Sequence, residues 1–343
     1  MPNYNFSVYK LKFKSPVHFA DAMADYGHSL NIYHSDSMYA ALTAAIATVS
    51  NNLQAENPYT ISSLFPYAQA KDGSIVYFFP KPLNYYKIPR GQITQHKKFK
   101  KIAWLDQHYF TQVINGNSLY EIADLEHIRF NEFLSQKDLI EPVSQKWVAA
   151  RVQVPRYIPG SGQKQDARPF YMERVQFYES AGLYFMALGD NEHFELLEKQ
   201  LSILQDFGLG TDRNVGNGHF IWERDSISLD LPESDYLLNC GMYIPRVDEF
   251  SMPEFSHNLL SFRIQRRGGW ITTPPFNSFR KNDIYAFDVG SIIKYAYVST
   301  PVSLGRMVDL TPPAEFIKEK MTHPILRNGK TIFLPIKTYE KCL

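Results

Sequence analysis

Four glycines fall within eleven residues of this chain, between a segment with helical periodicity and a segment with strand alternation. They are Gly208, Gly210, Gly216 and Gly218. Glycine adopts positive φ without steric cost and lets a backbone approach a ligand closely, and successive amide groups can surround phosphate oxygens. Arg213 and Asn214 lie between the glycine pairs and His219 follows them, so we predict a phosphate-binding loop. The alternative is an ordinary long turn between a helix and a strand.

The context of this loop excludes two familiar nucleotide-binding motifs. A dinucleotide-binding fold needs a strand before the loop and a helix after it, whereas here the order is reversed and Arg213 replaces the third glycine. A P-loop needs an earlier glycine ahead of its Gly-Lys-Thr, and the chain has Pro324 there, before Gly329-Lys330-Thr331. We therefore expect neither type of nucleotide site and no cofactor.

Hydrophobic periodicity around the loop predicts a ferredoxin-like (RRM-type) first domain. The segments are a strand at 6–13, a helix at 35–49, a hairpin at 175–188, a helix at 190–208 and a strand at 218–229. Ser35-Asp36-Ser37 offers N-cap oxygens to the first helix, and Asp190 and Gly208 bound the second helix. This order gives a four-stranded antiparallel sheet with two helices on one face.

The rest of the chain divides around this pattern. Residues 58–146 are irregular and are interpreted as an insertion in a first domain spanning 1–230. A second, strand-rich domain spans 231–343, with strands near 236–243, 283–287 and 292–298 and a hairpin at 325–333, where Asn328-Gly329 favours a type I′ turn. We predict an α+β fold of two ferredoxin-like domains in tandem.

Charge alone does not direct this chain to nucleic acid. Lysine and arginine number 36 against 35 acidic residues, so any RNA affinity has to come from local patches. Residues 146–174 hold six basic residues against two acidic ones, with aromatic residues between them. The arginines are Arg151, Arg156, Arg168 and Arg174. Cations beside aromatic rings suit single-stranded RNA, so we predict an RNA-binding basic hairpin, with a solvated loop as the alternative.

Two further basic clusters have weaker support. Arg263, Arg266, Arg267, Arg280 and Lys281 follow one another with no acidic residue between the first and the last. Arginines of this kind grip phosphate through paired hydrogen bonds, and we include Arg266 and Arg267 in the predicted RNA-binding set; acidic residues of a neighbouring subunit are an equal alternative. The run from Lys97 to Lys101 is typical of a solvated face.

The sequence gives little support for catalysis, metal binding or membrane insertion. Cys240 and Cys342 lie far apart without metal-ligand neighbours, which favours a reducing, cytoplasmic compartment. We expect no signal peptide and no membrane span, because the chain opens on strand alternation and holds no run of eighteen apolar residues. His28 and His34 are the candidates for acid–base cleavage of RNA. An isolated histidine is weak evidence, so we expect no enzyme and no metal.

The motifs together resemble a known family. A helix followed by a glycine loop around a basic residue, and then a strand, is similar to the RAMP superfamily of CRISPR proteins. His34-Ser35-Asp36-Ser37-Met38-Tyr39-Ala40-Ala41-Leu42 and Arg266-Arg267-Gly268-Gly269-Trp270-Ile271, with Arg280-Lys281, Ile284-Tyr285 and Gly290-Ser291, resemble the fourth Csm subunit of type III-A effectors, a Cas-five-like group. Ser35 enters the predicted RNA-binding set through this match.

The resemblance implies a function. It implies a non-catalytic scaffold that holds the 5′ tag of a CRISPR guide RNA, docks the large polymerase-like subunit and abuts the first backbone RAMP subunit in antiviral defence. It also implies that the basic hairpin is thumb-like. The family more often has glycine and lysine where this chain has Thr211 and Asp212, so the acidic residue would weaken one phosphate contact. A guide-processing endoribonuclease and a protein-only interaction module are the alternatives.

Overall fold

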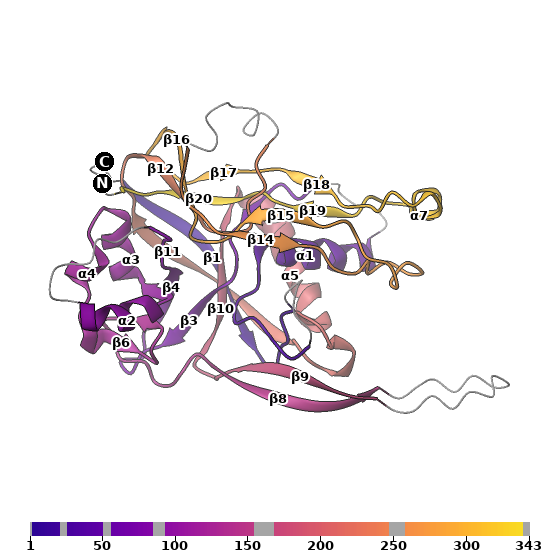
Figure 1. Ribbon diagram of the computed structural model, residues 1–343, viewed down its shortest axis with the longest axis horizontal. Coiled ribbons are helices and arrows are strands. Elements are labelled where there is room, and N and C mark those ends of the chain that lie inside the picture. Colours follow the sequence, from indigo (N-terminus) through magenta and orange to yellow (C-terminus); the bar gives the residue numbers. More distant parts are fainter. Residues whose placement is uncertain are drawn as a thin grey trace.

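The computed structural model describes residues 2–20, 26–50, 56–84, 93–153, 168–246 and 258–338. Within them the protein has a mixed α+β fold, with mostly antiparallel sheets and few helices (Figure 1). The described part contains no helix long and apolar enough to cross a membrane.

A nine-stranded sheet forms the centre of the molecule, in the order β11-β1-β10-β3-β4-β5-β7-β6, with β2 also paired to β10. Its strands are β1 (Asn3–Phe13), β2 (Thr60–Ile61), β3 (Phe65–Gln69), β4 (Ile75–Pro80), β5 (Trp104–Asp106), β6 (Ile128–Arg129), β7 (Phe133–Leu134), β10 (Ala181–Leu188) and β11 (Phe220–Asp230). β1 pairs with β11 along its whole length, from Asn3 opposite Asp230 to Phe13 opposite Phe220. The predicted strands at 6–13 and 218–229 are therefore confirmed.

Two helices, α1 (Ser35–Val49) and α5 (Asn191–Phe207), pack against each other beside this sheet. α5 matches its prediction: the Asp190 side chain caps it in a reciprocal pair with His193, and Gly208 ends it at φ 77°. The apolar stripe of α5, formed by Phe194, Leu197, Leu201 and Leu204, is buried. The predicted cap of α1 is wrong, because His34 is the N-cap residue and its side chain makes no capping bond.

The predicted hairpin at 175–188 is also wrong. β9 (Arg168–Phe177) pairs with β8 (Ser144–Gln153) in a separate two-stranded ribbon that extends along the lower edge of the molecule (Figure 1). β10 instead pairs with β1 and β3. The residues of β10 from Ala181 to Ala187 are all buried, and a strand covered on both faces takes a central place with a neighbour on each edge.

The segment interpreted as an insertion takes part in the central sheet. β3 lies next to β10, and β4 follows it. The helices of this segment are α2 (Ile93–Lys101), α3 (Gln107–Ile114), α4 (Leu119–Ile122) and the 3-10 turn η1 (Leu125–His127). They gather at one end of the sheet, on the left of Figure 1.

The last third of the described chain is built from strands. A five-stranded sheet has the order β13-β16-β12-β20-β17. Its strands and the two neighbouring ribbons are β12 (Ser234–Asn239), β13 (Leu259–Ser261), β14 (Ile264–Arg267), β15 (Ile284–Phe287), β16 (Ile292–Val298), β17 (Val302–Leu304), β18 (Met307–Asp309), β19 (Leu326–Asn328) and β20 (Thr331–Pro335), with the helix α7 (Glu315–Lys320). Leu238, Ile332 and Leu334 of this sheet belong to the same apolar core as β1 and α1.

The predicted type I′ hairpin at 325–333 does not form. β19 pairs with β18, whereas β20 pairs with β12 and β17. Neither Asn328 nor Gly329 has the positive φ that this turn requires. A Cβ on Gly329 would lie 2.4 Å from the Ile244 side chain, so the glycine serves close packing rather than a tight turn.

Candidate nucleic-acid interface

The glycine-rich loop connects α5 to β11 and is built as a strained turn. All four glycines have positive φ, between 77° and 90°. Asp212 also has positive φ, at 64°, and leads into the one-turn 3-10 helix η2 (Arg213–Val215). Positive φ at an aspartate is uncommon, although Asp and Asn tolerate it better than most residues. The conformational part of the loop prediction is therefore confirmed.

Three of the four loop glycines donate their amide N–H groups to carbonyls within the chain. Gly208 N–H donates to the carbonyl of Leu204, Gly216 N–H to that of Arg213 and Gly218 N–H to that of Pro16, so these amides are already used within the chain. The prediction that they cradle phosphate is wrong for this conformation. Backbone crowding explains Gly210 and Gly218, because an added Cβ would lie 2.5 Å from the carbonyl oxygen of His18 or 2.0 Å from that of Leu209.

The apex of the loop is the part that a ligand can reach. Arg213, Asn214 and Gly216 are exposed. A hollow of about 340 Å³ opens beside the apex, between α1 and α5, and Arg213, Asn214 and His219 line it together with Ala41 and Ala45. The fold thus brings the three polar residues predicted around the loop to one concave surface.

The basic ribbon presents its arginines on one face. Cross-strand partners in an antiparallel pair share a face, and the register places Trp147 opposite Arg174 and Arg151 opposite Phe170. Arg168, at the start of β9, has the same parity as these β9 residues and is exposed. Arg156 lies outside the described residues. One face of the ribbon therefore combines cations with aromatic rings, as predicted for a single-strand contact.

The carboxylate of Asp212, which was expected only to weaken a phosphate contact, joins this face to the loop. Arg151 Nη2 lies 2.7 Å and Arg174 Nη2 2.9 Å from Asp212 Oδ2. The Nδ2 of Asn217 donates to the same oxygen at 3.1 Å. The sequence signal for this pairing was an acidic residue between two glycine pairs, with a strongly basic hairpin earlier in the chain.

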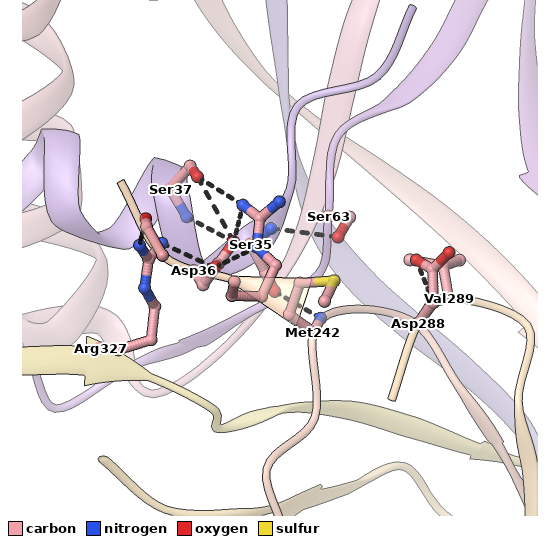
Figure 2. A network of polar contacts seen from close by, with 10 residues as sticks. Ser35, Asp36, Ser37, Ser63, Met242, Asp288, Val289 and Arg327 are labelled. Carbon is pink, nitrogen blue, oxygen red and sulfur yellow. Dashed lines mark hydrogen bonds and ion pairs between the residues drawn. The ribbon is translucent and has the colours of Figure 1, made fainter. Parts of the chain in front are cut away.

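The start of α1 forms a second, buried ionic junction (Figure 2). Arg267 Nε donates to Asp36 Oδ2 at 2.8 Å, and Arg327 Nη1 donates to the same oxygen at 2.7 Å. The side chains of Asp36, Arg267 and Arg327 are 1%, 6% and 7% exposed. Burial alone would raise the pKa of Asp36, but the two guanidinium groups outweigh burial and hold the pKa of this carboxyl well below its usual range.

Ser35 belongs to the same buried junction. Its Oγ accepts the amide N–H of Met242 at 2.8 Å, and its own N–H donates to Ser63 Oγ at 3.0 Å (Figure 2). Ser35 and Arg267, both predicted to bind RNA, are thus buried and bonded within the chain. Their positions favour a structural role that ties α1 to the strand-rich third of the molecule.

Three arginines of the cluster around Arg263 pair with acids of the chain itself, which neither alternative anticipated. Arg263 Nε donates to Asp288 Oδ2 at 2.7 Å, and Arg266 pairs with Asp283. The Arg280 guanidinium lies over the Trp270 ring, 5.1 Å from its centroid. Burial, reinforced by the charge of Arg327, lowers the pKa of Lys281 to about 8.

The remaining candidate residues are a buried histidine, a surface histidine and the lysines of α2. His34 is buried, with 4% exposure, at the start of α1, and His28 lies 3.7 Å from Glu173 at the surface. Lys97, Lys98, Lys100 and Lys101 are exposed on α2, as expected for a solvated face, while Phe99 is buried. No group of three or more metal-ligating side chains occurs in the described residues.

Comparison with known proteins identifies relatives over nearly the whole chain. A family model described as the CRISPR Csm4 C-terminal domain matches residues 233–336. A protein of Methanocaldococcus jannaschii named CRISPR system Cms protein Csm4 is 23% identical over 384 residues, covering 96% of each chain. A protein of the same name from Thermococcus onnurineus is 24% identical and covers 70% of this chain and 76% of the relative.

Solved structures share the fold. A chain in a crystal structure of a Csm1-Csm4 cassette in complex with cA4 matches with a TM-score of 0.59 at 18% identity, covering 98% of this chain and 100% of the other. A match in the Csm3-Csm4 subcomplex of a type III-A CRISPR-Cas interference complex has a TM-score of 0.58 at 19% identity, covering 97% and 100%.

Proposed function

From the similarity to Csm4 proteins over nearly the whole chain, we propose that this chain is a Csm4-type, non-catalytic, RNA-binding scaffold subunit of a type III-A CRISPR interference complex. It binds the 5′ tag of the guide RNA and serves antiviral defence in the cytoplasm. Its partners are the guide RNA, a large polymerase-like subunit of the Csm1 type and an adjacent backbone subunit of the Csm3 type. The crystallised Csm1-Csm4 cassette and Csm3-Csm4 subcomplex support these partners.

The architecture supports a ferredoxin-like first domain. The run β11-β1-β10-β3 in the central sheet, with α1 and α5 packed together beside it, has the strand order of that fold. In this arrangement residues 1–230 form the first domain, and the β8/β9 ribbon is its thumb-like hairpin. Residues 231–343 form the second domain.

The observation that carries the RNA-binding proposal is the shared surface of loop and ribbon. The exposed Arg213 and Asn214 lie at a concave surface beside α1 and α5, and Asp212 ties the same loop to the ribbon face that bears Arg151, Arg174 and Trp147. Cations supply phosphate contacts, and the aromatic rings offer stacking for unpaired bases.

The test is co-expression of the full chain with its genomic neighbours and a CRISPR array. We expect the chain to co-purify with a large polymerase-like subunit, a backbone subunit and guide RNA whose 5′ end is protected from nuclease. Purified chain should not cleave repeat RNA. An assembly without RNA, or protection confined to the 3′ end, would contradict the proposal. Metal-independent cleavage abolished by His34→Ala would favour a guide-processing enzyme instead.

A further inference from the structure

Three donors from two separate segments converge on a single oxygen of Asp212. Arg151 and Arg174 come from opposite strands of the ribbon, and Asn217 comes from the loop. The donor–acceptor distances to Oδ2 are 2.7, 2.9 and 3.1 Å. The side chains of Arg151, Arg174 and Asp212 are 33%, 16% and 23% exposed, so the junction lies at the surface and a ligand can approach it.

The three side chains carry more N–H donors than the Asp212 carboxylate uses. Two guanidinium groups face one negative charge, which leaves the junction with an excess positive charge. The Nε of Arg174 is buried and has no hydrogen-bond partner in the described part of the chain. Nε and Nη2 form one edge of a guanidinium, and that edge binds two oxygens of a phosphate or carboxylate at once. Asp212 satisfies only the Nη2 of this edge.

The backbone at Asp212 is held in an uncommon conformation by the same contacts. Its φ of 64° and ψ of 26° lie in the left-handed region, which carries a steric cost for a residue with a Cβ and persists where the surroundings enforce it. Besides the three side-chain bonds, Asn217 Nδ2 also donates to the main-chain carbonyl of Asp212, at 3.2 Å. Release of the carboxylate from the arginines would therefore free the turn to relax.

We propose that Arg151, Arg174 and Asn217 form a phosphate subsite for single-stranded RNA, and that the Asp212 carboxylate fills this subsite until a backbone phosphate displaces it. The proposal rests on the RNA-binding function proposed above and adds an internal competitor to it. A phosphate presents two unbridged oxygens, so it can satisfy Arg174 Nε as well as the donors that Asp212 already uses.

Competition from the Asp212 carboxylate makes the subsite more selective for an extended RNA strand. A stray phosphate has to displace a tethered carboxylate, whose effective concentration is high because it belongs to the same loop. An RNA strand that also contacts Arg213 and the ribbon face has additional interactions to offset that displacement. The subsite thus favours a strand laid along the whole surface over isolated phosphate groups.

The test compares the full-length wild-type chain with Asp212→Asn, using a fluorescent single-stranded oligoribonucleotide copied from the RNA that co-purifies. Asparagine keeps the shape and tolerates positive φ, but it removes the competing charge. We expect about tenfold tighter binding at low salt, and a plot of log K against log salt that is steeper by about 0.7 for one added phosphate contact. Equal or weaker binding with an unchanged slope would overturn the proposal.

Two controls keep the result specific. Asp235→Asn removes a partly exposed acid that lies 3.8 Å from Lys294 on the strand-rich sheet, and it should leave affinity and slope unchanged. An equal gain in affinity would reduce the effect to net charge and overturn the proposal. Arg174→Gln combined with Asp212→Asn should abolish the gain, whereas a retained gain would contradict the subsite. Asp212→Gly, which suits positive φ, repeats the test if Asp212→Asn folds poorly.

The outcome also separates the two proposals. If the wild-type chain and its assembly bind no RNA, the proposed function fails. If the wild-type chain binds RNA and Asp212→Asn does not tighten it, only the displaceable carboxylate fails.

Discussion

Two carboxylates in this molecule, Asp36 and Asp212, are each held by a pair of arginines from distant segments, yet their surroundings differ. Asp36 and its partners Arg267 and Arg327 are almost fully buried. Asp212 and its partners Arg151 and Arg174 are between 16% and 33% exposed. The same arrangement of one acid and two guanidinium groups therefore occurs once in the interior and once at the surface.

Burial decides which role such an ion cluster can take. In the interior, water cannot replace a lost partner, so removing the carboxylate leaves two desolvated cations and is strongly destabilising. At the surface, water and salt screen the arginines, and another anion can take the place of the carboxylate. The buried junction is suited to joining two parts of a fold, and the exposed junction is suited to exchange.

The largest expected effect is the loss of stability that a substitution of Asp36 causes. Asp36→Asn should lower the free energy of unfolding by about 3 kcal/mol or more, because Arg267 and Arg327 lose their counter-charge in the interior. Urea unfolding of the full chain measures this loss. Asp212→Asn, the matched change at the surface, should cost about 1 kcal/mol or less. Similar losses for the two variants would remove the distinction between the junctions.

The second-largest expected effect is the weakening of the buried junction by acid. The pKa of Asp36 is lower in the folded chain than its ordinary value of about 3.9, so its stabilising contribution is complete above that value and is lost as the pH falls toward the folded pKa. The stability gap between wild type and Asp36→Asn should narrow as the pH falls below about 4. Urea midpoints compared between neutral and acidic pH check this, and a constant gap would refute the pairing.

A substitution of Arg213 should have an intermediate effect, on RNA affinity and not on stability. Arg213→Gln should weaken RNA binding several-fold and make the salt dependence shallower by about 0.7, the value for one phosphate contact. Because Arg213 is exposed, the unfolding midpoint should not move. Arg280→Gln, an exposed arginine over Trp270, is the matched control, and an equal loss of affinity there would point to general charge attraction.

The smallest expected effect concerns Lys281, a cation beside the buried junction. Burial, reinforced by Arg327, lowers its pKa to about 8, so below that pH its charged form is destabilising in the folded chain. Wild-type stability should rise as the pH increases from about 8 toward the unfolded value near 10.4. Lys281→Met should raise the melting temperature by about 1–2 °C at neutral pH and lose this advantage in alkali. The exposed Lys294→Met should show neither change.

Local signals in the sequence were sufficient for elements that depend on local chemistry. α5 was predicted with its cap at Asp190 and its end at Gly208, because caps and a 3.6-residue period act within a few turns. β1 and β11 followed from alternation. The positive φ at all four loop glycines could likewise be expected from residue type alone.

Long-range pairing decided the features that were missed. Whether β10 pairs with β9 or with β1 and β3 depends on segments more than a hundred residues away, and a local hairpin pattern carries no information on that choice. The amides of Gly208 and Gly218 have partners in Leu204 and Pro16, which a loop motif alone does not reveal. The acids that neutralise Arg263, Arg266 and Arg267 come from outside the sequence window in which the arginines stood out.

The position of β1 in the sheet constrains how the chain can be made. Asn3 and Asp230 pair across a separation of 227 residues. At about 5–20 residues per second on the ribosome, the first strand waits roughly ten to forty seconds for this partner to be synthesised. During that time the edge of β1 that β11 covers has no strand partner, and an unpaired strand edge is a template for aggregation.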